Sequence, residues 1–138
     1  MARSRSYREC RAEALAALYG RLPLAIATNA SVSRRPMIEL ALERVGFAKY
    51  FQHIFCYTDL GYRKDRPEFW WAVEQGLAVP MHHIAMVGDS YEQDAVAPRS
   101  FGIQGVWFNP AGSVAGSDTR TPVVHSLETF ARWISSTA

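Results

Sequence analysis

Four polar side chains stand at or near the ends of apolar runs, and their chemical types suit phosphate chemistry. Thr28 ends one such run, Asp89 follows another with Asp94 five positions later, and Lys64 lies in the loop before a helix. A hydroxyl and backbone amides can hydrogen-bond phosphate oxygens, an ammonium group can neutralise them, and carboxylates can hold a hard cation. Brought together, these residues would form a site for phosphate and magnesium.

Lys64 stands out because the chain otherwise relies on arginine, with 13 Arg and 2 Lys. An ammonium group is a compact point charge and a guanidinium group is a planar fork, so a site built for one does not accept the other. Lysine at this position favours a role for its charge, with a chance occurrence as the alternative.

Strand and helix patterns alternate along the chain. Short apolar runs predict strands at 22–28, 53–58, 84–87 and 103–108, the first of them buried on both faces. Helical patterns predict helices at 4–20, 34–45, 67–75, from just after Asp89 to about Ser100, and after Ser126. The whole chain, 1–138, is predicted to be one domain, with a lead-in helix within 1–21, a loop at 109–122 and a C-terminal strand and helix at 123–138.

Capping residues mark several of these helix ends. Ser33 is a candidate N-cap with Pro36 in the first turn that follows, and Gly46 is expected to end that helix. Gly76 is expected to close the next helix, and Ser126 to cap the last one.

This alternation predicts an α/β fold, a three-layer Rossmann-like parallel sheet with helices on both faces. In open sheets of this kind, ligands bind beyond the carboxyl ends of the strands. The residues just after each apolar run are therefore the candidate site.

Each signal also has a purely structural interpretation. Thr28 and Asn29 could start a turn, Asp89 could cap a helix, and Asp94 could be a solvated helical carboxylate. The pair Trp70-Trp71 is best interpreted as a core residue beside an edge residue.

Composition and charge bound the possible functions. The chain has 138 residues, 49% hydrophobic and 20% charged, which fits a globular domain and excludes a disordered or fibrous class. A net charge of +2 argues against nucleic-acid binding, and no apolar run is long enough to span a membrane. Cys10 and Cys56 are interpreted as buried free thiols of a cytoplasmic protein.

Three segments taken together resemble the haloacid dehalogenase-like (HAD) hydrolase superfamily. They read LAIATN, GYRKDRPEFW and IAMVGDSYEQDAVAPRSFGIQGVWF, and they cover about residues 12–110 in the family's order. The spacing VGDS-x-x-x-D is the specific part, whereas ATN is weak by itself.

The resemblance implies a magnesium-dependent phosphatase, since most members are phosphatases and some are dehalogenases or mutases. It casts Thr28 as the phosphate-binding hydroxyl, next to Asn29 in the substrate site, and Lys64 as the group that stabilises phosphate charge. Asp89 would bind Mg²⁺, with Asp94 as a neighbouring ligand or support. The substrate would be a small phosphorylated metabolite.

The chain departs from the family in one severe respect. HAD enzymes attack with an aspartate of a DxDx[T/V] motif on the first strand, but here the first aspartate is Asp59 and no D-x-D occurs. There are also two local departures. Asp65 follows Lys64 where the family has proline, and its carboxylate could pair with Lys64. Pro98 falls inside a predicted helix and is expected to kink or end it.

The sheet is therefore expected to be incomplete at its first strand. In the family that strand lies between those that end here at Thr28 and Asp89. Since unpaired backbone groups are not tolerated in a sheet centre, these two strands must pair directly, another chain must fill the gap, or the fold must rearrange. The hypothesis favoured here is a sheet that is rearranged or is completed by another chain, for example in a homodimer.

Three functional hypotheses follow. The first is the C-terminal part of a HAD-like phosphohydrolase, inactive as an isolated chain because the nucleophile is missing, with weak or absent Mg²⁺ binding. The second is a non-catalytic HAD-derived module for binding or oligomerisation, which would use the exposed sheet edge. The third is an unrelated nucleotide-binding or receiver module. The sequence argues against it, because it contains no glycine-rich phosphate-binding motif.

Overall fold

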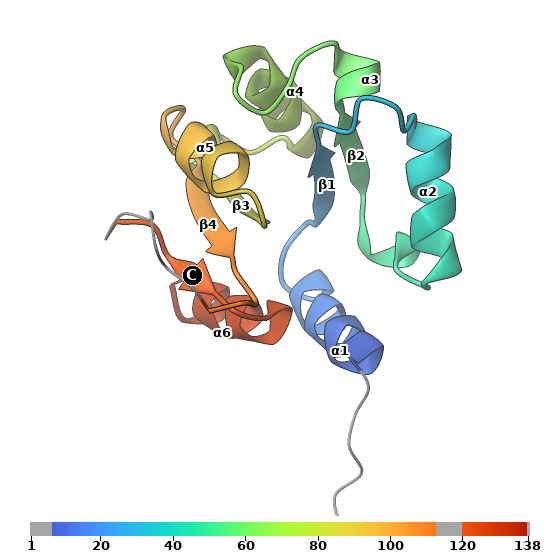
Figure 1. Cartoon of the computed structure of the whole chain (residues 1–138), viewed down its shortest axis with the longest axis vertical. Helices are drawn as coiled ribbons and strands as arrows, with labels where there is room; N and C mark the ends of the chain where they lie inside the picture. The colour runs from blue at the N-terminus through green and yellow to red at the C-terminus, as the bar shows by residue number, and fades with distance from the viewer. Residues whose placement is uncertain (1–6, 113–119, 138) are drawn as a thin grey trace, which may run out of the picture.

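The chain folds into short helices around two small parallel sheets (Figure 1). A computed structural model describes residues 7–112 and 120–137. Its elements are, in order, α1 (Tyr7–Tyr19), β1 (Ala25–Thr28), α2 (Arg35–Arg44), η1 (Ala48–Tyr50), β2 (His53–Cys56), α3 (Tyr57–Leu60), α4 (Pro67–Leu77), η2 (Met81–His83), β3 (Ala85–Gly88), η3 (Tyr91–Val96), α5 (Ala97–Arg99), β4 (Gln104–Phe108), β5 (Val123–Val124) and α6 (Leu127–Thr137). Residues 4–6 of the predicted first helix lie outside the described part.

The strands form two half-sheets. β1 pairs with β2 in parallel, with Thr28 opposite Cys56. β3 pairs in parallel with β4, with Gly88 opposite Trp107, and β4 pairs in parallel with β5. Within the described residues β1 and β3 do not pair with each other, so the direct pairing considered above is wrong for this structure. Each half-sheet ends in an open strand edge.

Two apolar cores cover the half-sheets. The α4 core consists of Phe55, Phe69, Trp70, Val73, Ile84 and Ile103. The α1–α6 core consists of Leu18, Val106, Val124, Phe130 and Ala131, and helices α1 and α6 lie side by side on that face (Figure 1).

Both half-sheets contact both cores. Ala27 of β1 and Met86 of β3 pack against the α4 core, whereas Leu24 before β1 and Val87 of β3 pack against the α1–α6 core. The two half-sheets therefore lie between the same helical layers, which confirms the predicted three-layer α/β architecture and its incompleteness.

The prediction that the first strand is buried on both faces is wrong. All four residues of β1 are only partly buried. The physical reason is the open edge, because a buried central strand needs a neighbour on each side and β1 has one, β2.

Two predicted caps are also wrong. The N-cap of α2 is Arg34 and not Ser33, and it makes no side-chain capping bond. Gly76 lies inside α4, whose left-handed C-cap is Ala78. At Gly76 a Cβ would lie 2.6 Å from the Phe55 ring, so this glycine serves close packing rather than helix termination. The Ser126 cap is confirmed, since its Oγ accepts from the Thr129 N–H at 3.0 Å.

Further boundaries differ from the prediction in informative ways. The strand predicted at 53–58 ends at Cys56, because Tyr57 and Thr58 already belong to the first turn of α3. Cys56 is a buried free thiol, as predicted, whereas the side chain of Cys10 lies outside the described part. Pro98 stands in the first turn of α5, where the π-helix η3 gives way to an α-helix. Across the described residues, no helix combines the length and apolar character that crossing a bilayer requires.

Candidate active site

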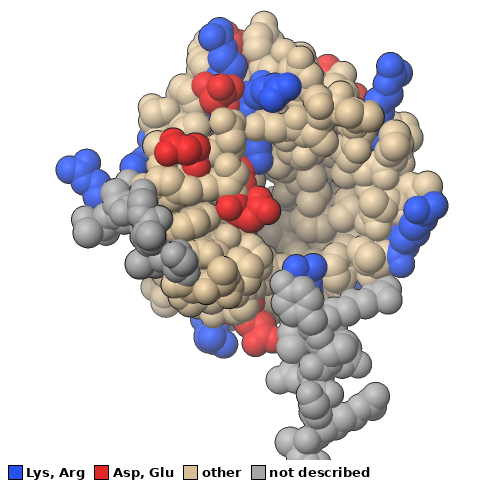
Figure 2. Space-filling model, viewed as in Figure 1, with Lys and Arg blue, Asp and Glu red and all other residues tan. Residues whose placement is uncertain are grey.

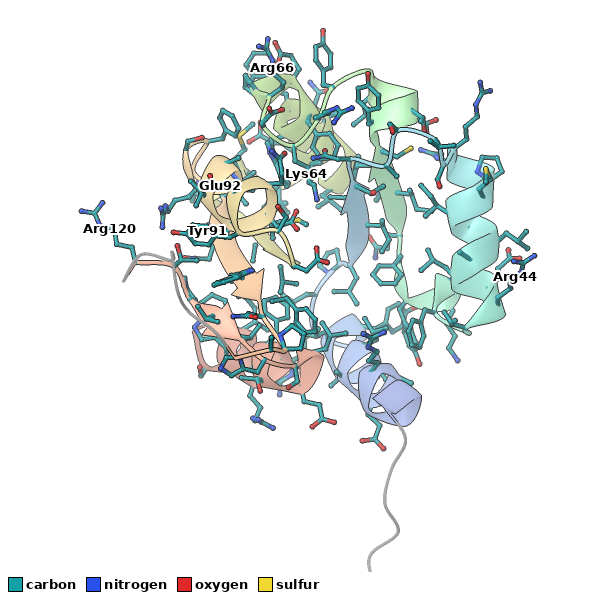
Figure 3. All side chains as sticks on the ribbon, in the orientation of Figure 1. Arg44, Lys64, Arg66, Tyr91, Glu92 and Arg120 are labelled. Carbon is teal, nitrogen blue, oxygen red and sulfur yellow. The ribbon has the colours of Figure 1, made fainter. Side chains whose placement is uncertain are left out.

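A buried ion pair joins Lys64 to Asp94 where β1 and β3 end. The Lys64 Nζ contacts Asp94 Oδ1 and also donates to the Ala27 carbonyl of β1 at 3.5 Å. Lys64 is 7% exposed and Asp94 3% exposed. Lys64 points into the interior, whereas Arg44 and Arg120 extend outward on opposite sides of the molecule (Figure 3). Its partner is Asp94, so the predicted pairing with the exposed Asp65 is wrong.

The local fold fixes the Asp94 carboxylate from both sides. Its second oxygen, Oδ2, accepts from the Ser90 N–H at 3.0 Å, and the Ser90 hydroxyl in turn caps η3 by accepting from the Gln93 N–H at 3.3 Å. A Cβ at Gly88 would overlap this carboxylate. Glycine at the end of β3 is therefore what lets Asp94 fold back over the strand.

The backbone of Lys64 is held at both its polar groups. Its N–H donates to the Asn29 Oδ1 at 2.8 Å, and its carbonyl accepts from the Trp70 indole at 2.8 Å. Trp70 is 1% exposed and Trp71 53% exposed, as the core-and-edge interpretation predicted. The positioning role of Trp70 was missed, although a buried indole N–H needs an acceptor and Lys64 lies only six residues away.

Asn29 also links the two half-sheets. Its Nδ2 donates to the Gln93 Oε1 at 2.9 Å, so one side chain at the end of β1 reaches both the Lys64 loop and η3. The Asn29 amide already donates to Gln93 and accepts from Lys64. The predicted contact of Asn29 with the substrate stays a prediction. Gln93 was not among the predicted site residues, and nothing local in the sequence marks it.

Thr28 and Asp89 flank this cluster. The Thr28 Oγ1 accepts from the Ala30 N–H at 3.1 Å, which leaves its own O–H to donate. The Asp89 carbonyl accepts from the Trp107 indole at 3.0 Å, and residue Asp89 itself is exposed. The structure thus joins Asn29, Lys64 and Asp94 directly and places Thr28 and Asp89 beside them in the chain.

An exposed ion pair follows Lys64 at the start of α4. The Arg66 Nη2 lies 3.2 Å from the Glu68 Oε1, and this hydrogen bond raises the pKa of Arg66. The pKa of Glu68 is lowered, first by its own backbone N–H at the helix start and then by Arg66. Since both groups are solvated, the pair adds little stability.

The residues fit a magnesium ion only in part. Among the described residues, no three His, Cys, Asp or Glu side chains gather as a metal site. Both oxygens of Asp94 already have protein donors, so Asp89 is the carboxylate that stays exposed to a cation. A separate cavity of about 300 Å³ lies against Arg35, Glu39 and His53 and includes none of the predicted site residues.

Comparison with known proteins settles the family. The profile described as haloacid dehalogenase-like hydrolase matches residues 2–102. The chain belongs to the haloacid dehalogenase-like hydrolases. Among curated proteins, none matches this HAD-like chain.

Solved structures share the fold over most of the chain. A HAD phosphatase from Thermococcus onnurineus is 23% identical with a TM-score of 0.75, and the match covers 88% of this chain and 55% of that one. A 2-haloacid dehalogenase from Pseudomonas syringae pv. tomato DC3000 is 25% identical, with a TM-score of 0.77 and coverage of 91% and 52%. The magnesium-bound HAD-hydrolase YfnB from Bacillus subtilis is 22% identical, with a TM-score of 0.75 and coverage of 89% and 52%. The chain spans about half the length of these three structures.

Proposed function

We propose that this chain carries the phosphate-binding half of a magnesium-dependent phosphohydrolase site and does not turn over substrate by itself. The observation that carries the proposal is the buried Lys64–Asp94 pair near the carboxyl ends of β1 and β3. Replacing a buried ion pair by apolar residues is often neutral or stabilising, so stability alone gives little reason to keep one. An ammonium group braced at strand ends suits the charge of a phosphate group.

Each residue has a distinct part in this site. The Thr28 O–H would donate to a phosphate oxygen, and the Lys64 ammonium would offset the charge on the others. Asp94 and Asn29 would act as positioning residues that hold Lys64. Asp89 would hold Mg²⁺, with water and phosphate oxygens in its other positions, and the bound ion would neutralise phosphate charge. With one exposed carboxylate, this binding is expected to be weak.

The aspartates of this sequence form no D-x-D pattern, so the family's motif assigns none of them the attacking role. The first of them, Asp59, is on α3 and pairs with Arg35 at 3.1 Å. In a well-studied hydrolase, removal of the nucleophile lowers turnover by roughly 10⁶. We therefore expect the isolated chain to bind phosphate without hydrolysing phosphoesters.

Phosphate suits this site better than a haloacid, although the structural neighbours include enzymes named for both. A haloacid carries the single charge of its carboxylate, whereas a phosphate group carries more negative charge and more oxygens with which to bind a cation. A phosphate group approaching with Mg²⁺ would bring the cation that Asp89 can hold. The proposed substrate class is a small phosphorylated metabolite of the cytoplasm.

The open edges of β1 and β3 support a second function, a non-catalytic module that pairs with another chain. A homodimer that completes the sheet would be one form of it. This function predicts a stable oligomer that binds neither phosphate nor Mg²⁺.

Phosphate titration distinguishes the two functions. We expect inorganic phosphate with Mg²⁺ to raise the Tm of the chain, and Thr28→Val and Asp89→Asn each to reduce this rise. A matched control is Thr129→Val, on α6, which should leave the phosphate effect unchanged. An equal Tm with and without phosphate and Mg²⁺ would contradict the proposed site.

A further inference from the structure

A cavity of about 300 Å³ lies between α2, η1 and the first residues of β2. Helix α2 stands at the edge of the molecule beside β2, and η1 lies in the connection between them (Figure 1). No residue of α2 is buried, so the helix does not close against β2 along its length. The cavity is separate from the Lys64 site, and its lining includes none of the residues assigned to that site.

One part of the cavity wall is apolar. It consists of the half-buried side chains of Leu42, Ala48, Phe51 and Ile54. A wall of this kind favours contact with the hydrocarbon part of a ligand. The Phe51 ring also offers a π face, which attracts a cation. The wall therefore suits a ligand that combines an aliphatic part with positive charge.

The charged part of the lining is acidic once ion pairs are taken into account. Arg35 lines the cavity, but its guanidinium group is paired with Asp59 at 3.1 Å. Arg44 extends outward from α2 (Figure 3), and basic side chains project from this edge of the molecule in the space-filling view (Figure 2). The remaining formal charges in the lining at neutral pH are the carboxylates of Glu39 and Glu43.

Glu39 and Glu43 are spaced for two cations rather than one. They lie four residues apart on α2, which places their Cβ atoms about 5–6 Å apart on one face of the helix. Neither carboxylate has an ion-pair partner within the described residues. His53 also lines the cavity, but no three His, Cys, Asp or Glu side chains in the described part of the chain gather as a metal site. Two ammonium groups joined by a short chain match this arrangement, with one ammonium group for each carboxylate.

We propose that this cavity binds a short aliphatic diamine. One ammonium group would donate to Glu39 and the other to Glu43, while the methylene groups between them would pack on Leu42 and Phe51. A four-carbon chain between the two nitrogens has about the length of one helical turn, which is the separation of the two glutamates. The site acts through side chains of α2, η1 and β2 and does not depend on the proposed hydrolase activity.

A titration followed by amide chemical shifts tests the proposal on the full chain. The probe is diaminobutane with an amine at each end, used at low salt, where charge pairing is least screened. The matched control is butylamine, which keeps the hydrocarbon chain and has one ammonium group. We expect one diamine to bind per chain and to shift the amide signals of Leu42, Phe51 and His53. It should bind at least about tenfold more tightly than butylamine.

Protein variants change the charge and the space of the cavity one at a time. Glu39→Gln and Glu43→Gln each remove one carboxylate from an exposed position and should weaken diamine binding about tenfold. Glu128→Gln, on α6, is the matched control and should leave the binding unchanged. Ala48→Leu fills the cavity without changing its charge and should abolish binding in a chain that stays folded by circular dichroism.

Three results would overturn the proposal. The first is the absence of diamine binding to the folded parent chain. The second is a pattern of shifts confined to other segments, such as α6. The third is equal binding of diaminobutane and butylamine, or an equal loss for Glu39→Gln and Glu128→Gln, since either would mean that the two carboxylates of α2 do not hold the ligand.

Discussion

Lys64 and Asp94 lie thirty residues apart in the sequence and form a buried ion pair that spans the two half-sheets. Lys64 comes from the loop before α4, which is anchored to the end of β1 through Asn29. Asp94 comes from η3, which follows β3. Together with the Asn29–Gln93 bond, the pair is therefore a polar link between two sheets that share no strand pairing within the described residues.

The first prediction concerns this pair. Lys64→Met leaves the Asp94 carboxylate buried without its partner, and this should lower the free energy of unfolding by about 3–5 kcal/mol. The double variant Lys64→Met/Asp94→Leu removes both charges and should be more stable than Lys64→Met alone. Urea unfolding measures these two variants and the single variant Asp94→Leu. If the double variant loses at least as much free energy of unfolding as the two single variants together, the pair is not coupled.

The second prediction concerns the close approach at Gly88. A Cβ there overlaps the Asp94 carboxylate, so Gly88→Ala should destabilise the chain by about 1–3 kcal/mol through overpacking. Gly20→Ala is the matched control, since the nearest atoms to its added Cβ lie 4.0 Å away. Thermal unfolding should show a clear loss for the first variant and none for the second.

The third prediction separates the adjacent tryptophans. Trp70→Phe keeps an aromatic ring but removes the donor to the Lys64 carbonyl, which should cost about 1–3 kcal/mol. Trp71→Phe changes an exposed ring and should stay within about 0.5 kcal/mol of the parent. Equal losses for the two variants in urea unfolding would contradict the anchoring role of Trp70.

The fourth prediction uses the lowered pKa of Glu68. A depressed pKa in the folded state means that the group adds stability above its unfolded value of 4.5, and that this contribution is lost as the pH falls through the folded value. The small difference in Tm between the parent and Glu68→Gln should therefore be present at neutral pH and vanish in acid. A difference that grows as the pH falls would have the wrong sign.

The sequence predicts the ends of strands better than their surroundings. Thr28 and Phe108 end strands as expected because apolar runs followed by polar residues are local signals. The opening between the half-sheets required knowledge of the family, since no local pattern reports a missing neighbour. Because no strand lies between β1 and β3 in the described structure, β1 is only half-buried despite its apolar sequence.

Contacts between distant residues explain the remaining differences. Gly76 resembles a helix stop in sequence, and only the Phe55 ring, twenty-one residues earlier, shows why it is a glycine. Asp65 is Lys64's neighbour in the chain, yet the fold delivers Asp94 to the ammonium group instead. The bond from Asn29 to Gln93 joins residues 64 positions apart and has no signature in either segment.

The most direct test of the proposed function is hydrolysis of p-nitrophenyl phosphate by the purified chain with Mg²⁺, compared with Asp89→Ala. We predict equal background rates, because the chain lacks the attacking aspartate of the family motif, and loss of the nucleophile lowers turnover by roughly 10⁶ in a well-studied hydrolase of another type. Turnover by the parent that Asp89→Ala abolishes would contradict this account and would mean that this chain, or a partner chain, supplies a nucleophile.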